Sequence, residues 1–238
     1  MSEMYATDHL ISNAEKYPNE PAMSWKESGQ WVTMTWSQYL GYTMSIAKAM
    51  IAMGFEAGDH SAIFSYNRAE WYASSHAAMF CGGANAGVYH TSSSEEVEHV
   101  IGNSDAKVVF LGGNPMDGGV TEKKCSYRLS RVLPNLDKVE KVVVMDEIDM
   151  PDDHRVVSWS DFIASGSGVP DSTVHESKER VMAAIRNAGF EWPRRRDLPP
   201  WIVPSSVVRN WVIRKGSSWP ESVIPRSRLS ATCARRRS

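Results

Sequence analysis

The sequence HSAIFSYNRAEWYASSHAAMFCGGANAGVYHTSSSEEVEHVIGNSDAKVVFL, residues 60 to 111, decides the fold of this 238-residue chain. The apolar run at 62–64 predicts a strand, and small and aromatic residues then recur from Ala69 to Phe80 at the spacing of one helix face. A strand at 84–89, a helix after Ser93 and a strand at 108–111 follow. Strands separated by single helices require crossover connections, so the sequence predicts an α/β fold with a mostly parallel sheet and helices on both faces.

Three short patterns occur in order within this stretch. They are N-x-x-E-W from Asn67, G-G-x-x-x-G-x-Y from Gly82 and N-S-x-A-x-V from Asn103. In this combination and spacing they resemble the N-terminal subdomain of the adenylate-forming acyl-CoA synthetases, and most of all the long-chain, bubblegum-type members. The resemblance extends from about residue 6 to residue 185. It implies that residues 1–185 are the N-terminal part of an AMP-dependent synthetase/ligase domain.

The flanking sequence continues the alternation of helices and strands. Capping signals predict helices that begin at Thr7, at Thr35 with Gln38, at Ser93 with Glu96, at Ser158 with Asp161, and at Thr173 with Glu176. Two runs, 22–25 and 31–34, predict a hairpin that turns at Ser28 and Gly29, and Gly54 is placed to end the second helix. A helical stretch to residue 133 and a strand at 141–145 follow. The methionines of the second helix can be read as a lipid-binding surface, but core packing is the better interpretation.

Bulk composition excludes some classes of protein. Hydrophobic residues make up 42% of the chain, yet none of its apolar runs reaches eighteen residues, so we expect no membrane span. The N-terminus lacks the layout of a signal peptide. The three cysteines, Cys81, Cys125 and Cys233, show neither disulfide nor metal spacing. We therefore expect a cytoplasmic protein, with peripheral association at the endoplasmic reticulum membrane as the alternative.

Charge divides the chain into two parts. Residues 1–185 carry 14 basic and 25 acidic side chains, a net charge of −11, whereas residues 186–238 carry 12 and 3, a net charge of +9. The second part also holds six of the twelve prolines and four of the nine tryptophans, which predicts little regular structure. One hypothesis is that residues 186–238 are out-of-family sequence from a frameshift, a retained intron or a mispredicted exon. The alternative is an arm that binds nucleic acid or a membrane surface.

Several loops and side chains can be considered for a site. The loop GGNPMDGG, 112–119, lacks the lysine and hydroxyl of a P-loop, so a connecting loop is the better interpretation than a phosphate cradle. The acidic run 146–153 with His154 is interpreted as a solvated loop and not a metal site. The segment ASGSG, 164–168, is interpreted as a flexible link. The sequence contains no G-x-S-x-G elbow.

Among single residues, His90 and Asn67 are best placed, because ligands of α/β sheets bind outside the carboxyl ends of strands. His76 and Trp71 are interpreted as packing residues. Glu95 and Glu96 point apart on a helix and form no acid/base pair. We assign none of these residues a catalytic, cofactor-binding or metal-binding role.

The resemblance implies ATP-dependent ligation of a long-chain fatty acid to CoA. In this reaction the carboxylate attacks the α-phosphate of ATP to give an acyl-adenylate and pyrophosphate, and the CoA thiol then displaces AMP, with magnesium as the metal. The family's T-S-G-T-T-G-x-P-K-G loop, adenine motif, metal-binding acid, ribose-binding Asp and catalytic lysine match no position of this sequence. We therefore expect this fragment alone to be inactive and to bind neither ATP, Mg nor CoA. The alternative is a non-catalytic binding or regulatory module that pairs with a full-length relative.

Overall fold

A computed structural model describes residues 6–148, 150 and 153–187. Its main element is a five-stranded sheet formed by β3 (His60–Phe64), β4 (Ala84–Val88), β5 (Ala106–Leu111), β6 (Lys141–Val144) and β7 (Val156–Ser158). The strand order is β4-β3-β5-β6-β7, and every neighbouring pair is parallel. The predicted parallel α/β sheet is therefore confirmed, although the sequence did not predict the three-residue strand β7. The predictions for residues 188–238 and for Cys233 lie outside the described residues.

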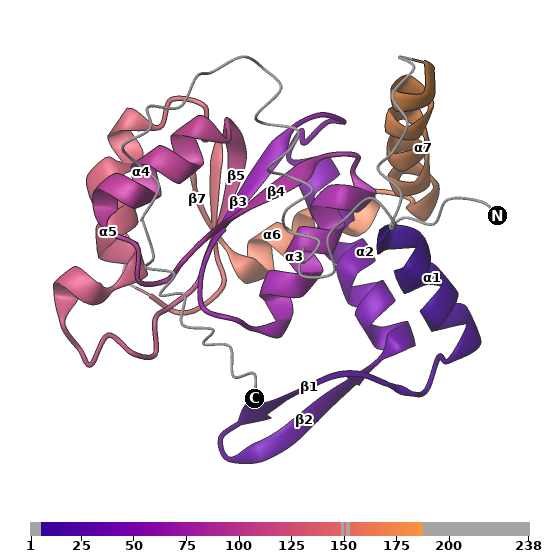
Figure 1. Ribbon diagram of the computed structural model, residues 1–238, viewed down its shortest axis with the longest axis horizontal. Coiled ribbons are helices and arrows are strands. Elements are labelled where there is room, and N and C mark those ends of the chain that lie inside the picture. Colours follow the sequence, from indigo (N-terminus) through magenta and orange to yellow (C-terminus); the bar gives the residue numbers. More distant parts are fainter. Residues whose placement is uncertain (1–5, 149, 151–152, 188–238) are drawn as a thin grey trace, which may run out of the picture.

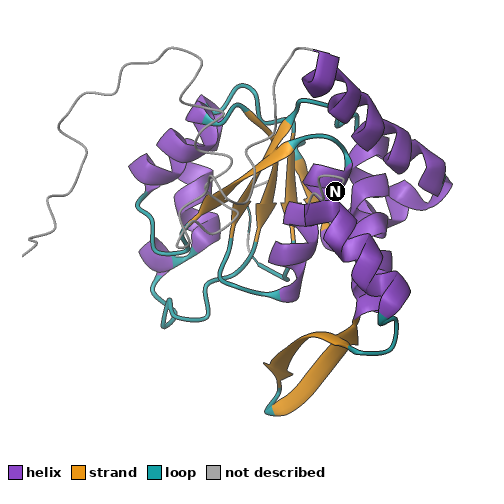
Figure 2. Ribbon diagram, turned by 45° about the vertical axis from the view of Figure 1, so that its right-hand side comes forward, coloured by secondary structure: helices purple, strands orange, loops and turns teal. Residues whose placement is uncertain are grey.

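Helices cover both faces of the sheet, as Figures 1 and 2 show. On one face lie α1 (Ala6–Lys16), α2 (Trp36–Ala52), α3 (Ala69–Phe80), α6 (Trp159–Ser165) and α7 (Asp171–Asn187), and on the other lie α4 (Ser94–Asn103) and α5 (Cys125–Val132). Successive side chains of a strand point to opposite faces of the sheet, so the strand residues divide between two hydrophobic cores. Ile63, Phe110 and Val143 are aligned in register and face α2 and α3, whereas the next residues along, Phe64 and Leu111, face α4 and α5.

The methionines of α2 belong to the core and not to a lipid-binding surface. Met50 is fully buried and Met44 nearly so, and both pack in the cluster between α2, α3 and the sheet. Burial of one such side chain contributes roughly 1.5–3 kcal/mol to folding. The interpretation of this stripe as core packing is confirmed.

The predicted hairpin is present and longer than expected. Strands β1 (Pro21–Glu27) and β2 (Gln30–Thr35) pair antiparallel and form a sheet of their own, which projects from the body of the molecule in both views (Figures 1 and 2). Ser28 and Gly29 both have positive φ, 49° and 82°. A two-residue turn of this kind matches the twist of the strands, which explains why the sequence signal was reliable.

Three of the five predicted helix caps are confirmed. Thr35 with Gln38, and Ser93 with Glu96, form complete capping boxes, and the Ser158 hydroxyl accepts from the Asp161 N–H. Gly54, with φ of 85°, follows the end of α2 as predicted.

The predicted caps at Thr7 and Thr173 are wrong. Thr7 lies inside α1 and is buried, and α7 begins at Asp171, two residues before Thr173. Tyr17 follows α1 and is exposed. In each case spacing alone does not fix where a helix begins or ends.

The ASGSG segment is not a flexible link. It ends α6 and continues into the short 3₁₀ helix η3 (Gly166–Gly168), which packs against α2. Two further 3₁₀ turns, η1 (Thr121–Lys123) and η2 (Leu133–Asn135), flank α5. The predicted helical stretch to residue 133 is therefore a 3₁₀ turn, a short α-helix and a second 3₁₀ turn.

Candidate functional site

The carboxyl edge of the sheet is the candidate site, because the chain leaves two neighbouring strands there in opposite directions. After β3 the chain enters α3 on one face, and after β5 it enters α5 on the other. Such a switch point is where open α/β sheets bind ligands. Here it lies between residues 65–68, after β3, and residues 112–114, after β5.

An ion pair that the sequence did not predict occupies this position. Arg68 Nη1 lies 2.6 Å from both carboxylate oxygens of Asp146, which follows β6, and Arg68 Nε donates to Glu70 Oε2 at 2.7 Å. The side chain of Arg68 is only 14% exposed. Burial alone would lower the pKa of Arg68, but the hydrogen bonds to Glu70 and Asp146 outweigh it, so the pKa lies above its ordinary value.

Asp146 also fixes the glycine loop after β5. The Gly113 N–H donates to Asp146 Oδ2 at 2.7 Å, so one carboxylate joins the loops after β3, β5 and β6. The interpretation of the run 146–153 as solvated is therefore wrong at Asp146. It is also wrong at Asp153, which forms an ion pair with Arg155 that lowers its pKa well below its ordinary value. Glu147 and His154 are exposed.

Ser65 and Gly112 form the floor of the switch point. Ser65 is 4% exposed, and its hydroxyl has no hydrogen-bond partner among the described residues. A Cβ atom at Gly112 would lie 2.1 Å from Ser65 Oγ and 3.6 Å from Arg68 Nη1. Only glycine therefore allows the two strand ends to approach this closely.

A second arginine, which is buried, organises the neighbouring loops. Arg128, on α5, is 7% exposed and donates to the carbonyl oxygens of His90, Ser92 and Lys123. Its guanidinium also lies over the Phe64 ring, 5.3 Å from the centroid. Arg128 thus attaches the loop after β4 and the loop after β5 to the first turns of α5.

The residues considered from the sequence are not brought together. Asn67 is exposed after β3, and His90 is half-buried after β4, where its main-chain carbonyl accepts from Arg128. His76 lies on α3, where its Nδ1 is 2.9 Å from Tyr39 Oη and 3.0 Å from the Tyr72 carbonyl oxygen. Trp71 packs against the core as expected, with its ring near Gly87.

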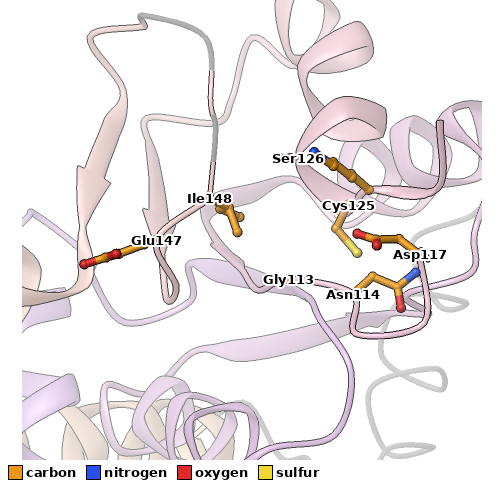
Figure 3. A pocket seen from close by; sticks show the side chains of 8 residues that line it. Gly113, Asn114, Asp117, Cys125, Ser126, Glu147 and Ile148 are labelled. Atoms are coloured by element: carbon orange, nitrogen blue, oxygen red, sulfur yellow. The ribbon is translucent and has the colours of Figure 1, made fainter. Parts of the chain in front are cut away.

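A shallow pocket of about 170 Å³ lies beside the switch point (Figure 3). It is lined by the 112–119 loop, the N-terminal turn of α5 and the segment after β6. Figure 3 shows the Cys125 thiol pointing toward Asn114 and Asp117, and Glu147 pointing away from them. The loop itself is held by its own side chains, because Asn114 Oδ1 accepts from the Met116 N–H and Asp117 Oδ1 from the Gly119 N–H.

The described cysteines are poor nucleophiles. Burial raises the pKa of Cys81 to about 12 and that of Cys125 to about 11, so both remain thiols near neutral pH. Burial likewise raises the pKa of Tyr39, so its phenol stays neutral beside His76. Within residues 6–148, 150 and 153–187, no three His, Cys, Asp or Glu side chains gather as metal ligands, and no helix has the length and apolar character needed to cross a membrane.

Comparisons with known proteins identify the relatives of this chain. The family model of AMP-binding enzymes matches residues 10–185. The human long-chain-fatty-acid–CoA ligase ACSBG2 is 24% identical over 180 residues, which are 76% of this chain and 26% of the relative. The rat ligase ACSBG1 is 25% identical over 160 residues, 67% of this chain and 21% of the relative. The chain thus spans about a quarter of the length of these relatives.

A solved structure shows the same fold. Coronafacic acid ligase from Pectobacterium brasiliense superposes with a TM-score of 0.56 and 18% sequence identity, over 68% of this chain and 29% of the ligase. At this identity the match concerns the fold alone.

Proposed function

Because the chain belongs to the family of AMP-binding enzymes, we propose that residues 1–185 are the N-terminal part of a long-chain fatty acid:CoA ligase. The observation that carries the proposal is the family match over residues 10–185, together with curated relatives that are themselves long-chain-fatty-acid–CoA ligases. The ligase activity belongs to a complete ligase domain. The role of this part is to provide the α/β scaffold on which the remainder of such a domain packs.

The described residues do not fit ATP and magnesium. A nucleoside triphosphate is held by backbone N–H groups and a lysine, and its metal ion by carboxylate ligands. The switch point instead holds Arg68 paired with Asp146, and no metal-ligand group forms among the described side chains. The motifs that hold ATP, Mg and CoA in the resembling family match no position of the sequence. We therefore derive no catalytic step from this chain and propose that it is inactive alone.

The test is pyrophosphate release by the purified chain with ATP, magnesium, a long-chain fatty acid and CoA. The expected rate is that of a heat-denatured control, whereas a full-length ligase in the same assay releases pyrophosphate. Release by this chain above the denatured control would refute its inactivity. The family assignment would remain, since it rests on the matched residues and not on turnover.

The second candidate is a non-catalytic module that pairs with a full-length relative. It is supported by two exposed tyrosines beside β4, the end strand of the described sheet: Tyr89, which follows β4, is 81% exposed, and Tyr72 of the adjacent α3 is 45% exposed. Co-purification of the chain with a full-length ligase at micromolar concentration tests this candidate. Loss of the complex on Tyr89→Ser would support it, and no complex at that concentration would reject it.

We further propose that residues 186–238 are a segment outside the family and that the protein is cytoplasmic, with peripheral association at the endoplasmic reticulum membrane as the alternative. The first proposal is supported by the family match, which ends at residue 185, and by the change of net charge there. Sequencing the transcript across codons 180–200 tests it, and an uninterrupted reading frame in abundant protein contradicts it. Flotation with vesicles of endoplasmic reticulum lipid composition tests the second proposal. The full-length chain should remain at the bottom of the gradient, and flotation with the vesicles would favour the peripheral alternative.

A further inference from the structure

The crevice between the ends of β3 and β5 contains donors that its ion pair leaves unused. Arg68 donates through Nε and Nη1, and among the described residues its Nη2 has no hydrogen-bond acceptor. The Ser65 hydroxyl, buried beside Gly112, also has no hydrogen-bond partner in the described part of the chain. A buried hydroxyl without a partner destabilises the fold, so its presence at a switch point calls for an explanation.

Asp146 is held there in the way that proteins hold anionic ligands. Its carboxylate accepts from the Arg68 guanidinium and from the Gly113 N–H, at 2.6 and 2.7 Å. Guanidinium groups and loop N–H groups are the usual receptors for carboxylates and phosphates. Arg68, Gly113 and Ser65 therefore form a receptor whose anion is supplied by the chain itself.

The occupying group comes from a separate segment. Ser65 and Arg68 follow β3 and Gly113 follows β5, whereas Asp146 follows β6. The Asp146 side chain is 31% exposed, about twice the fraction of Arg68, so Asp146 is the more accessible partner of the pair. A dissolved anion would meet Asp146 first and would reach Arg68 by replacing it.

We propose that this crevice is a binding site for an oxyanion, a carboxylate or a phosphate group, and that Asp146 occupies the oxyanion position until the ligand displaces it. In the bound state Arg68 and the Gly113 N–H hold the ligand, and Ser65 donates to it once the end of β5 relaxes at Gly112. Glu70 stays paired with Arg68 and orients the guanidinium. The proposal does not depend on ligase activity.

The competing explanation is that the ion pair only joins three loops. The two explanations differ for Asp146→Asn, which keeps the shape of the side chain and an oxygen that accepts from Gly113, but removes its charge. A purely structural pair predicts lower stability and unchanged anion affinity. A displaceable occupant predicts tighter binding, because the internal competitor no longer carries a charge and the guanidinium keeps only Glu70 as a partner.

The experiment uses the full chain and titrates inorganic phosphate and, separately, octanoate at constant ionic strength. Calorimetry and thermal unfolding report binding. For Asp146→Asn we expect an affinity about tenfold or more above that of the wild type. Glu147→Gln is the matched control, since it makes the same charge change on the neighbouring exposed residue, and its affinity should equal that of the wild type. The double variant with Arg68→Gln should lose binding.

The two titrations show which kind of ligand the site binds. Tighter binding of phosphate indicates a site for phosphate groups, and tighter binding of octanoate indicates a site for carboxylates. Equal affinities of Asp146→Asn and wild type, or an equal gain in Glu147→Gln, would overturn the proposal. If Asp146→Asn does not fold, Ser65→Ala decides, because it leaves the ion pair intact. In the wild type, added anion should raise the unfolding temperature. Loss of this rise in Ser65→Ala would support the site. An equal rise in both proteins, or no rise in the wild type, would reject it.

Discussion

Gly166 lies directly against the backbone of Ala49. A Cβ atom at Gly166 would be 2.5 Å from the Ala49 nitrogen and 2.9 Å from its Cα atom, shorter than any ordinary contact. Ala49 is fully buried in the last turn of α2, and η3 packs against this helix. The absence of a side chain at Gly166 therefore sets the distance between η3 and the helix that covers the sheet.

Gly166→Ala should destabilise the chain by about 1–3 kcal/mol, because the added methyl group meets helix backbone that cannot move aside. Urea unfolding followed by tryptophan fluorescence measures the difference. Gly168→Ala is the control, since nothing lies within 4 Å of its Cβ position. Similar losses in both variants would show that chain flexibility, and not the contact with Ala49, determines the effect.

Ser93→Ala should lower stability by about 1 kcal/mol, because it removes one half of the capping box at the start of α4. The Glu96 N–H loses its acceptor, while the Glu96 carboxylate still accepts from the N–H of residue 93. Thermal unfolding gives the change, and Thr91→Ala, exposed two residues earlier, is the control. An effect of Thr91→Ala equal to that of Ser93→Ala would argue against the cap.

Arg128→Met should lower the free energy of unfolding by about 3 kcal/mol. It should also make the 112–124 loop sensitive to protease. The substitution keeps much of the apolar stem but leaves the carbonyl oxygens of His90, Ser92 and Lys123 without their donor. Limited proteolysis with mapping of the first cleavage measures the loop. Arg131→Met, on the exposed side of the same helix, should change neither property. First cleavage outside this loop in Arg128→Met would contradict the assigned role.

Local signals were predictable from the sequence, and long-range contacts were not. The capping boxes at Thr35 and Ser93 depend on residues three positions apart, and the strands β3 and β5 were predicted from short apolar runs. The pair of Arg68 and Asp146 joins residues 78 positions apart, which no local pattern encodes. At Thr173 a local signal was misleading. Its capping-box spacing with Glu176 occurs inside α7, where it has no capping role.

For the candidate site too, the position in the fold was predictable from the sequence and the long-range contacts were not. The carboxyl edge of the sheet, where Asn67 and His90 were considered, follows from parallel topology alone, but the switch point lies between the ends of β3 and β5. The side chains that form it, Arg68 and Asp146, were missed because charged residues in loops are usually solvated. A buried arginine without its own strand or helix pattern gives no sequence signal until its carboxylate partner is placed by the fold.

Asp153→Asn should reduce stability at pH 7, and the loss should shrink as the pH falls below about 4. The Asp153 carboxylate accepts from Arg155 at 2.7 and 3.0 Å, and these hydrogen bonds hold its pKa below the ordinary value. A group with a lowered folded-state pKa stabilises the fold above its unfolded pKa, and the contribution is lost as the pH falls through the folded pKa. The stabilities of wild type and variant should therefore become equal in acid.

Urea unfolding at pH 7, 5 and 3 measures the difference in stability, with Glu122→Gln, exposed on η1, as the control. A difference that stays constant down to pH 3 would mean that the carboxylate charge of Asp153 contributes nothing, and that Arg155 is held instead by the carbonyl oxygens of Leu133 and Leu136.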